Sequence, residues 1–385
     1  MTLPDYHGGS LANLMASLRA ALGRPSADYP PLRGLPPEEI ADARNVVLLV
    51  ADGLGLDLLR RIGAGSAWER HRRGAMTSVF PSTTASAITT FMTGEAPQQH
   101  ALTGWFTYLA EAGSVLAVLP FRARFGGASL SAAGIAPRDL FGLTPLFDTL
   151  AVPSVVVAPA WIAGTDFNTA HSGSARRIGY KGLAQLFASV ASVAEAPGRK
   201  YIYAYLPDID ALAHEHGTGS DKVAARFQEL DRLFGNFLET LRGSDTLVIA
   251  TADHGLIDTA PERMVKLSDH PELERTLVLP LCGEPRAAYC YVHPDRGAAF
   301  ERYVGDKLGH CAELHRSEEL LQRGFFGLGE PHPRLARRIG HYTLLMKDNW
   351  VIKDQVAGEK PFQHIGVHGG VSAEEMTVPL VVARV

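Results

Sequence analysis

The amino-acid sequence predicts an α/β protein, in which helices cover both faces of a mostly parallel central sheet to form a three-layer sandwich. Four short apolar segments have continuous rather than alternating hydrophobicity, which is typical of strands buried on both faces of a sheet: residues 45–50, 154–159, 200–206 and 246–250. Segments with apolar residues at helical spacing lie between them, as in residues 180–194 and 221–242. This alternation of strand and helix favours the α/β sandwich.

The individual elements are recognisable in chain order. Residues 10–22 have an amphipathic pattern that predicts a short helix, and a proline-rich connector follows. NVVLLV, SVVVAP, KYIYAYL and TLVIA are the four apolar strands, each rich in β-branched residues or tyrosine. Residues 221–242 repeat apolar side chains at helical spacing, beginning with Val223 and Phe227. We expect the C-terminal segment EEMTVPLVVARV to return to the same sheet.

A change in amino-acid composition and in the pattern of predicted elements divides the chain. From about residue 261 to 340, single strand-like pieces such as 287–292 and polar helix-like pieces such as 298–308 lie among many Pro, Arg and His residues. We therefore expect three parts: an N-terminal helix and connector at residues 1–37, an α/β core at 38–260 and 341–385, and an inserted cap at 261–340.

Length and composition restrict the class of protein. The chain has 385 residues, of which 46% are hydrophobic and 20% charged, so a disordered or fibrous chain is excluded. The 37 Lys and Arg residues against 41 Asp and Glu residues create no basic field, so we expect no stable nucleic-acid partner. The odd number of cysteines, 3, predicts reduced and mostly buried thiols.

The N-terminal region and the hydropathy profile suggest a location. The first thirty residues show no charged segment followed by an apolar one, and no stretch approaches the ~18 apolar residues that a membrane span needs. We expect a cytoplasmic protein without membrane association.

Three of the predicted strands each lead directly into an aspartate. Asp52 follows the first strand in VADGLG, Asp210 follows a later one in DIDALAHEHG, and Asp253 follows another in TADHG. Ligands of open α/β sheets collect outside the carboxyl ends of the strands, so we expect these carboxylates in one crevice. Each motif alone is also typical of a turn or a helix start, but their joint placement favours a shared site.

Histidines accompany the aspartates. His214 lies four residues after Asp210, His254 is adjacent to Asp253, and HIGVHGG near the C-terminus adds two more histidines. Aspartate and histidine together are the ligand set of zinc, and they tolerate manganese. Converging carboxylates without counter-charge repel one another and raise at least one pKa, which a divalent cation would prevent. The pattern therefore predicts a metal site.

The segment FPSTTASAITTFMTG, residues 80–94, contains the candidate nucleophile. Residues 84–92 predict a helix, and a hydroxyl at its N-terminus would lie among free backbone N–H groups that favour anions. A threonine alcohol is a poor nucleophile at neutral pH unless metal coordination lowers its pKa. The alternative is that Ser82, Thr83 and Thr84 serve only as helix caps.

The motifs VADGLG, FPSTT…TG, DIDALAHEHG, TADHG and HGG…EEMTVPL occur in this order from Asp52 to Leu380. In this order they resemble the alkaline phosphatase superfamily, and within it the type I phosphodiesterase / nucleotide pyrophosphatase family. The resemblance implies an alkaline phosphatase-like α/β sandwich with two zinc ions bridged by the substrate phosphate, and a threonine nucleophile on one of them.

The resemblance assigns seven residues to the two ions: Asp52, Thr84, Asp253 and His254 to one, and Asp210, His214 and His368 to the other. Thr84 is preferred to Thr83 because the nucleophile of the family lies three residues after a proline, here Pro81. His368 is preferred to His364 because the last histidine of the family directly precedes a glycine.

One departure concerns substrate recognition. The family has an asparagine about twenty residues after the nucleophile, where it binds a phosphate oxygen, and the corresponding stretch here is HALTGWFTY. Thr103, or a backbone amide near Gly104, could replace this donor. Trp105, Phe106 and Tyr108 could stack on a flat leaving group or could be ordinary packing.

These observations predict a two-metal hydrolase that cleaves phosphodiester or pyrophosphate bonds in small, nucleotide-like phosphate esters through a phospho-threonine intermediate. One alternative is a phosphomonoesterase of the same superfamily. A sulfatase would need cysteine or serine at position 84, where this chain has Thr84. The phosphate mutases of the superfamily usually carry serine there. A second alternative is a binding protein that holds a phosphorylated ligand without turnover.

Overall fold

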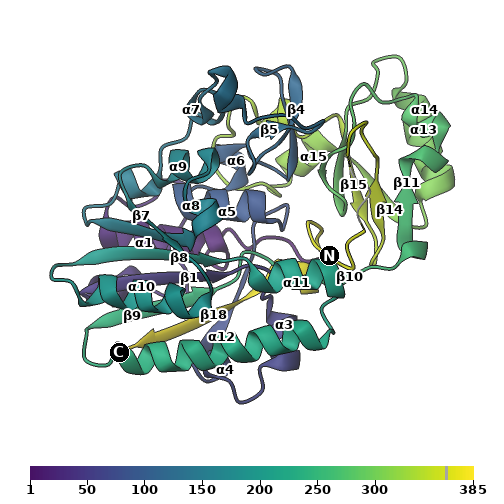
Figure 1. Cartoon of the computed structure of the whole chain (residues 1–385). Coiled ribbons are helices and arrows are strands. Elements are labelled where there is room, and N and C mark those ends of the chain that lie inside the picture. The colour runs from purple at the N-terminus through teal and green to yellow at the C-terminus, as the bar shows by residue number, and fades with distance from the viewer. Residues whose placement is uncertain (360–362) are drawn as a thin grey trace.

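Two sheets of seven strands each organise the computed structural model, which describes residues 1–359 and 363–385. The larger body at the left of Figure 1 surrounds the central sheet, and the second sheet lies at the upper right. The central sheet has the strand order β2-β18-β9-β1-β8-β6-β7.

Five parallel strands form most of the central sheet: β9 (Thr246–Thr251), β1 (Asn45–Ala51), β8 (Lys200–Leu206), β6 (Ser154–Pro159) and β7 (Arg176–Tyr180). β18 (Thr377–Arg384) pairs antiparallel with β9 and with the edge strand β2 (Arg72–Thr77). Every residue of β1 and β8 is buried, as their continuous hydrophobicity predicts. The predicted α/β fold with a mostly parallel sheet is confirmed.

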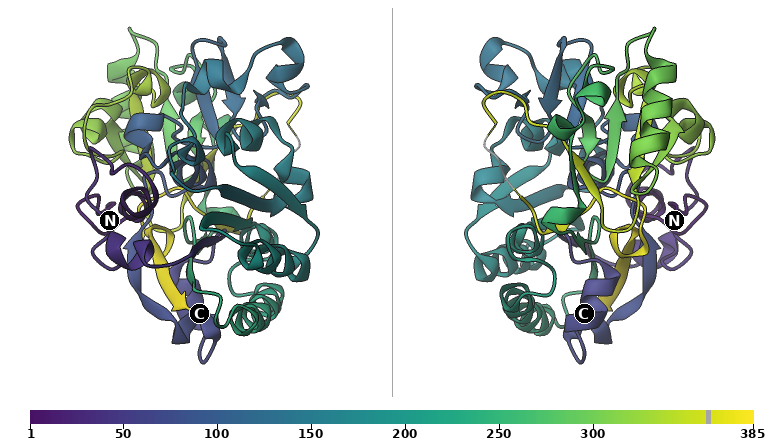
Figure 2. Two further views of the ribbon diagram at one scale, coloured as in Figure 1. Left: turned by 90° about the vertical axis from the view of Figure 1, so that its left-hand side faces the viewer. Right: turned by 90° about the vertical axis from the view of Figure 1, so that its right-hand side faces the viewer.

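Helices cover both faces of this sheet (Figure 1). On one face lie α1 (Leu11–Leu22) and α5 (Thr84–Thr93), and on the other α10 (Leu183–Glu195) and α12 (Asp221–Thr240). The left view of Figure 2 shows this layering, with the purple α1 separated from two teal helices by the strands. α10 begins later than expected because the chain up to Tyr180 belongs to strand β7, and Gly182 precedes the helix.

The second sheet is antiparallel and joins segments that are far apart in the chain. Its order is β14 (Ala312–Arg316), β15 (Tyr342–Met346), β13 (Ala287–Cys290), β12 (Cys282–Glu284), β3 (Phe106–Leu109), β4 (Ser114–Ala117) and β5 (Arg122–Ala123). Of the strands of this sheet, β12, β13 and β14 lie in the expected cap at 261–340, whereas β3–β5 and β15 come from segments expected in the core. Among the described residues, the pair Gly283 and Phe106 joins the two groups of strands.

Shorter elements complete the chain: α2 (Pro37–Ala41), α3 (Leu56–Ile62), α4 (Ala67–Arg70), α6 (Pro97–His100), α7 (Pro137–Phe141), α8 (Ala160–Ala163), α9 (Asp166–Ser172), α11 (Asp208–His216), β10 (Ile257–Asp258), β11 (Met264–Lys266), α13 (Pro271–Glu274), α14 (Gly297–Tyr303), α15 (Ser317–Gln322), α16 (Leu335–Arg338), β16 (Val351–Lys353), β17 (Gly366–Val367) and α17 (Ala373–Met376). The three cysteines are buried and form no disulfide. In the described part of the chain, none of the helices combines the length and the apolar character that crossing a bilayer requires.

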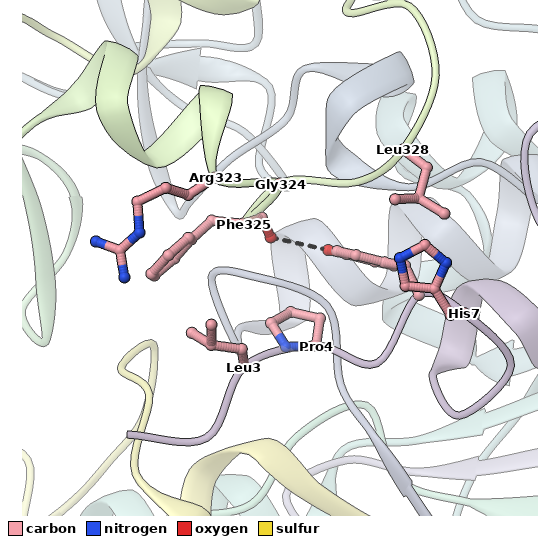
Figure 3. A pocket seen from close by; sticks show the side chains of 8 residues that line it. Leu3, Pro4, His7, Arg323, Gly324, Phe325 and Leu328 are labelled. Carbon is pink, nitrogen blue, oxygen red and sulfur yellow. Dashed lines mark hydrogen bonds between the residues drawn. The ribbon is translucent and has the colours of Figure 1, made fainter.

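The N-terminal segment packs against the loop after α15 and contacts the start of the threonine segment. Figure 3 shows this contact around a cavity of about 210 Å³ between Leu3, Pro4 and His7 on one side and Arg323 and Phe325 on the other. The Tyr6 hydroxyl donates to the Phe325 carbonyl at 3.1 Å and accepts from the backbone N–H of Phe80 at 3.4 Å. Phe80 begins the segment that leads to α5.

Candidate active site

Three aspartates meet at the carboxyl edge of the central sheet, as predicted. Asp52 directly follows β1, Asp253 lies two residues after β9, and Asp210 lies in the first turn of α11, after β8. The side chains of Asp52 and Asp253 are 2% and 0% exposed. Ionised carboxylates at this depth are costly unless each oxygen has a partner.

The carboxylates of Asp52 and Asp253 each have one oxygen with a hydrogen-bond donor and one without. Asp52 Oδ2 accepts from the Tyr205 hydroxyl at 2.5 Å, and Asp253 Oδ1 accepts from the backbone N–H groups of Gly53 and His254 at 3.1 and 3.0 Å. Among the described residues, no hydrogen-bond donor reaches the buried atoms Asp52 Oδ1, Asp210 Oδ1 and Asp253 Oδ2. These three oxygens are therefore available to a cation.

The histidines present their Nε2 atoms to the same place. The Nδ1 atoms lie against backbone carbonyls: His214 on Gly366 at 2.7 Å, His254 on Gly255 at 3.0 Å, and His368 on Ser82 at 3.2 Å. A carbonyl oxygen only accepts, so each Nδ1 carries a hydrogen and the lone pair of each neutral ring is on Nε2. Metal-ligating histidines are commonly oriented by this kind of contact.

The ligand atoms form two overlapping groups. One potential ligand atom each from Asp52, Asp253 and His254 lies within 4.8 Å of the others, and the same holds for Asp210, His254 and His368. His254 Nε2 is 3.3 Å from Asp52 Oδ1 and 3.4 Å from Asp253 Oδ2. His214 Nε2 lies 3.1 Å from Asp210 Oδ2. The structure thus brings all the predicted aspartates and histidines together, with His254 between the two groups.

Burial and the charges of neighbouring side chains shift the pKa values of the clustered aspartates and histidines. Burial raises the pKa of Asp52, and the nearby charges of Asp253 and Asp210 raise it further. For Asp210, burial also opposes the charged form, but His214 outweighs it and the pKa is lowered. The pKa of His214 is raised in turn, since Asp210 outweighs the effect of burial. The raised pKa of Asp52 means that its carboxyl group favours the neutral form unless a cation lies beside it.

The two neighbouring threonines point to different partners. Thr84 is the first residue of α5, and its Oγ1 lies 3.1 Å from His254 Nε2. Thr83 is the N-cap residue, and its hydroxyl donates to Glu284 Oε1 at 2.6 Å. Of these two hydroxyls, Thr84 is the one directed at the aspartates and histidines.

A family comparison agrees with this geometry. The profile of the type I phosphodiesterase / nucleotide pyrophosphatase family matches residues 46–370, which include the threonine segment and every predicted ligand. The chain belongs to this family. No curated protein matches the chain.

Solved structures of low sequence identity share the fold of this family member. Murine ectonucleotide pyrophosphatase / phosphodiesterase 5 is 16% identical with a TM-score of 0.64, and the alignment covers 87% of this chain and 87% of that one. The human protein of the same name is 17% identical with a TM-score of 0.61, over 88% and 87%. Phosphonoacetate hydrolase from Sinorhizobium meliloti 1021 is 15% identical with a TM-score of 0.64, over 89% and 91%.

This family member also has a buried glutamate beside the site that sequence reasoning missed. Glu284 ends strand β12 of the second sheet and is 7% exposed. Its Oε1 accepts from the hydroxyl of Thr83 and from the backbone N–H of Trp105, both at 2.6 Å. No sequence motif marks it, because only the pairing of β12 with β3 brings it to the threonine segment.

Glu284 also explains two features near the predicted ligands. A Cβ atom at Gly369, directly after His368, would lie 2.5 Å from the Glu284 Cβ, so no larger residue fits there. The amide of Trp105, near the donor expected at Gly104, is directed at Glu284. Burial raises the pKa of Glu284 to about 7.

We expect Glu284→Gln to stabilise the metal-free protein at pH 8. Glutamine keeps an acceptor for Thr83 and Trp105 without a buried charge. The folded pKa of Glu284 lies above the unfolded value, so the wild type loses stability relative to the variant as the pH rises from about 4.5 to 7. The expected difference is near zero at pH 4 and ~2–3 kcal/mol at pH 8, measured by urea unfolding in a chelator.

The exposed Glu272→Gln is the control for this experiment, and we expect it to show no such pH dependence. Equal stability of the Glu284→Gln variant and the wild type at both pH values would contradict the burial argument.

The three aromatic residues of the 104–108 segment have different environments. The Phe106 ring lies under the Arg124 guanidinium at 4.2 Å, and Tyr108 packs edge-on against Tyr291 at 5.3 Å. Trp105 is 38% exposed. Only Trp105 of the three therefore combines proximity to Glu284 with an accessible ring.

Proposed function

We propose that this protein hydrolyses phosphodiester or pyrophosphate bonds in small, nucleotide-like substrates, using two divalent metal ions and Thr84 as the nucleophile. The observation that carries the proposal is the set of three buried aspartate oxygens for which the described residues provide no donor, facing the histidine Nε2 atoms and the Thr84 hydroxyl.

The donor set fits divalent metal ions. Neutral histidines and aspartates are the usual ligands of zinc and are acceptable to manganese. The proposed ligands are Asp52, Thr84, Asp253 and His254 for one ion, and Asp210, His214 and His368 for the other. When bound, the ions would neutralise the carboxylates, lower the pKa of the Thr84 hydroxyl and stabilise negative charge on the phosphoryl oxygens.

The residues of the chain define the covalent steps. Thr84 Oγ1 loses its proton and attacks phosphorus in line with the leaving group. The bond from phosphorus to the leaving oxygen breaks, and that oxygen takes up a proton and departs as an alcohol or phosphate. The resulting phospho-threonine is then attacked at phosphorus by water. Breakage of the Oγ1–phosphorus bond releases a phosphate monoester and restores the hydroxyl.

Two of the structural relatives support the substrate class. An inactive variant of the murine phosphodiesterase, with one threonine replaced by alanine, is known in complex with AMP. The Sinorhizobium hydrolase is known in complex with phosphonoacetate. Both ligands are small and carry a phosphorus oxyanion, which is the group that the proposed metal sites would bind.

The proposal predicts faster hydrolysis of bis-p-nitrophenyl phosphate than of p-nitrophenyl phosphate by the zinc-loaded protein. Release of p-nitrophenol measures both reactions, and a chelator should abolish them until zinc is restored. Preference for the monoester would favour the phosphomonoesterase alternative. Binding of phosphate or AMP without turnover of either ester would favour a binding protein.

A further inference from the structure

A buried ion pair lies beside the proposed metal sites. Arg286 and Glu375 are 1% and 0% exposed, and the guanidinium donates through Nε to Oε1 at 3.1 Å and through Nη2 to Oε2 at 2.8 Å. Glu375 is in α17, between the last histidine and β18, and Arg286 lies between β12 and β13. The pair thus connects the second sheet to the loops at the edge of the central sheet.

The Glu375 carboxylate fixes the loop that carries His368. Its Oε1 accepts from the backbone N–H of Gly370 at 2.8 Å. The Gly370 carbonyl accepts from the Ser82 hydroxyl at 2.8 Å, and the Ser82 carbonyl accepts from His368 Nδ1 at 3.2 Å. The carboxylate therefore reaches the segment before Thr84 through two hydrogen bonds, and the His368 ring through a third.

The backbone of Glu375 fixes the loop that carries His254. Its carbonyl accepts from the Gly255 N–H at 2.8 Å, and the Gly255 carbonyl accepts from His254 Nδ1 at 3.0 Å. The approach is so close that a Cβ atom at Gly255 would lie 2.0 Å from the Glu374 carbonyl oxygen. One residue thus contacts the loops of two ligand histidines.

Arg286 extends the connection to the hairpin that carries Glu284. Its Nη1 donates to the Trp350 carbonyl at 2.6 Å, and its own carbonyl accepts from the Met346 N–H at 2.9 Å. Glu284 is two residues earlier, at the end of β12.

Fold stability alone does not account for the pair. A buried ion pair is commonly no more stabilising than apolar side chains of similar volume. Glu375 also forms a capping box with Ser372, but this serves a helix of only 4 residues. Only an acceptor at Glu375 can hold the Gly370 amide, and that contact leads to the ligands.

We infer that Glu375, held by Arg286, is a positioning residue that fixes the spacing of the His254 and His368 loops and of the Thr84 segment. The inference rests on the proposed function, because it assumes that these loops hold metal ions. It assigns the second glycine of HGG a role as well: a Cβ atom at Gly370 would lie 2.8 and 2.9 Å from the two carboxylate oxygens.

The first test is Gly370→Ala, which pushes the amide from the carboxylate and leaves both charged residues in place. We expect zinc affinity, measured by competition with a chromogenic chelator, to fall ~10-fold or more. Gly219→Ala, where an added Cβ meets no atom within 4 Å, is the matched control and should bind zinc as the wild type does. Wild-type zinc affinity in Gly370→Ala would overturn the inference.

The second test separates the acceptor from the charge. We expect the double variant Arg286→Met/Glu375→Leu to lose zinc affinity ~10-fold or more, and Glu375→Gln, which keeps an acceptor for Gly370, to stay within ~3-fold of the wild type. Arg338→Met removes a different buried arginine, 1% exposed, and should lower the unfolding midpoint of the metal-free protein without changing zinc affinity.

The outcomes distinguish the two proposals. A double variant that lowers only the metal-free unfolding midpoint, as Arg338→Met does, would show a purely structural pair and overturn the inference. Failure of the wild type to bind zinc would instead contradict the proposed function.

Discussion

Thr84→Ala is expected to lower kcat for bis-p-nitrophenyl phosphate by ~10³-fold or more, since no other hydroxyl in the described site lies against His254 Nε2. A loss of this size corresponds to ~4 kcal/mol of transition-state stabilisation. Steady-state release of p-nitrophenol by the zinc-loaded variant measures it. The variant lacks the oxygen that forms the covalent intermediate, so rapid quenching should also find no phosphorylated protein.

Two companion variants control for damage to the helix. Thr84→Ser keeps a hydroxyl at the same position and is expected to retain activity within ~100-fold of the wild type. Thr93→Ala removes another buried threonine of α5, whose hydroxyl donates to the Thr89 carbonyl at 2.7 Å and accepts from the Glu95 N–H at 3.3 Å, and should keep full activity. Wild-type turnover by Thr84→Ala would rule out Thr84 as the nucleophile and leave a water molecule in that role.

Asp253→Asn is expected to have opposite effects on stability with and without zinc. In a chelator at pH 8, the variant should be more stable than the wild type by ~1–2 kcal/mol, because one of the repelling carboxylates is gone. With zinc a thousandfold above its dissociation constant, the wild type gains ~4 kcal/mol for each site and the variant loses most of one such gain. Thermal unfolding in chelator and in zinc measures both differences.

The contacts of Asp253 explain why Asp253→Asn should change sign in its effect on stability between chelator and zinc. Asparagine can still accept from Gly53 and His254 through Oδ1, and it replaces the oxygen that has no donor among the described residues. Asp295→Asn changes a side chain that is 77% exposed, so it should behave like the wild type under both conditions. Destabilisation of Asp253→Asn by the same amount with and without zinc would indicate a structural aspartate.

The parts of the site that sequence reasoning could predict depend on local signals. A continuous apolar run followed by an aspartate identifies both a strand and its carboxyl end from a segment of about ten residues. Asp52 and Asp253 are predicted in this way. The parallel sheet then brings such residues together without further information. The same reasoning located the threonine segment, since a helix beginning after Pro81 is visible in the sequence alone.

Other parts depend on pairings that no local signal reveals. Glu284 reaches the threonine segment only because Gly283 pairs with Phe106, more than 170 positions earlier in the chain. The same pairing places β3–β5 in the second sheet, across the boundaries expected from composition. Tyr205 looked like an ordinary apolar residue of a buried strand, yet its hydroxyl donates to Asp52.

The position of β18 determines when the central sheet can be completed during synthesis of the chain. This strand lies between β9 and β2, and in the described part of the chain β2 has no other neighbour in the central sheet. While a ribosome is still making the chain, the first 370 residues can therefore form only an incomplete sheet, and His368 has no anchored loop. Glu375 lies in α17, directly before β18, so it leaves the ribosome shortly before this strand. The loop that carries His368 thus gains its contact with Glu375 only after β1, β8 and β9, which precede Asp52, Asp210 and Asp253, have been synthesised.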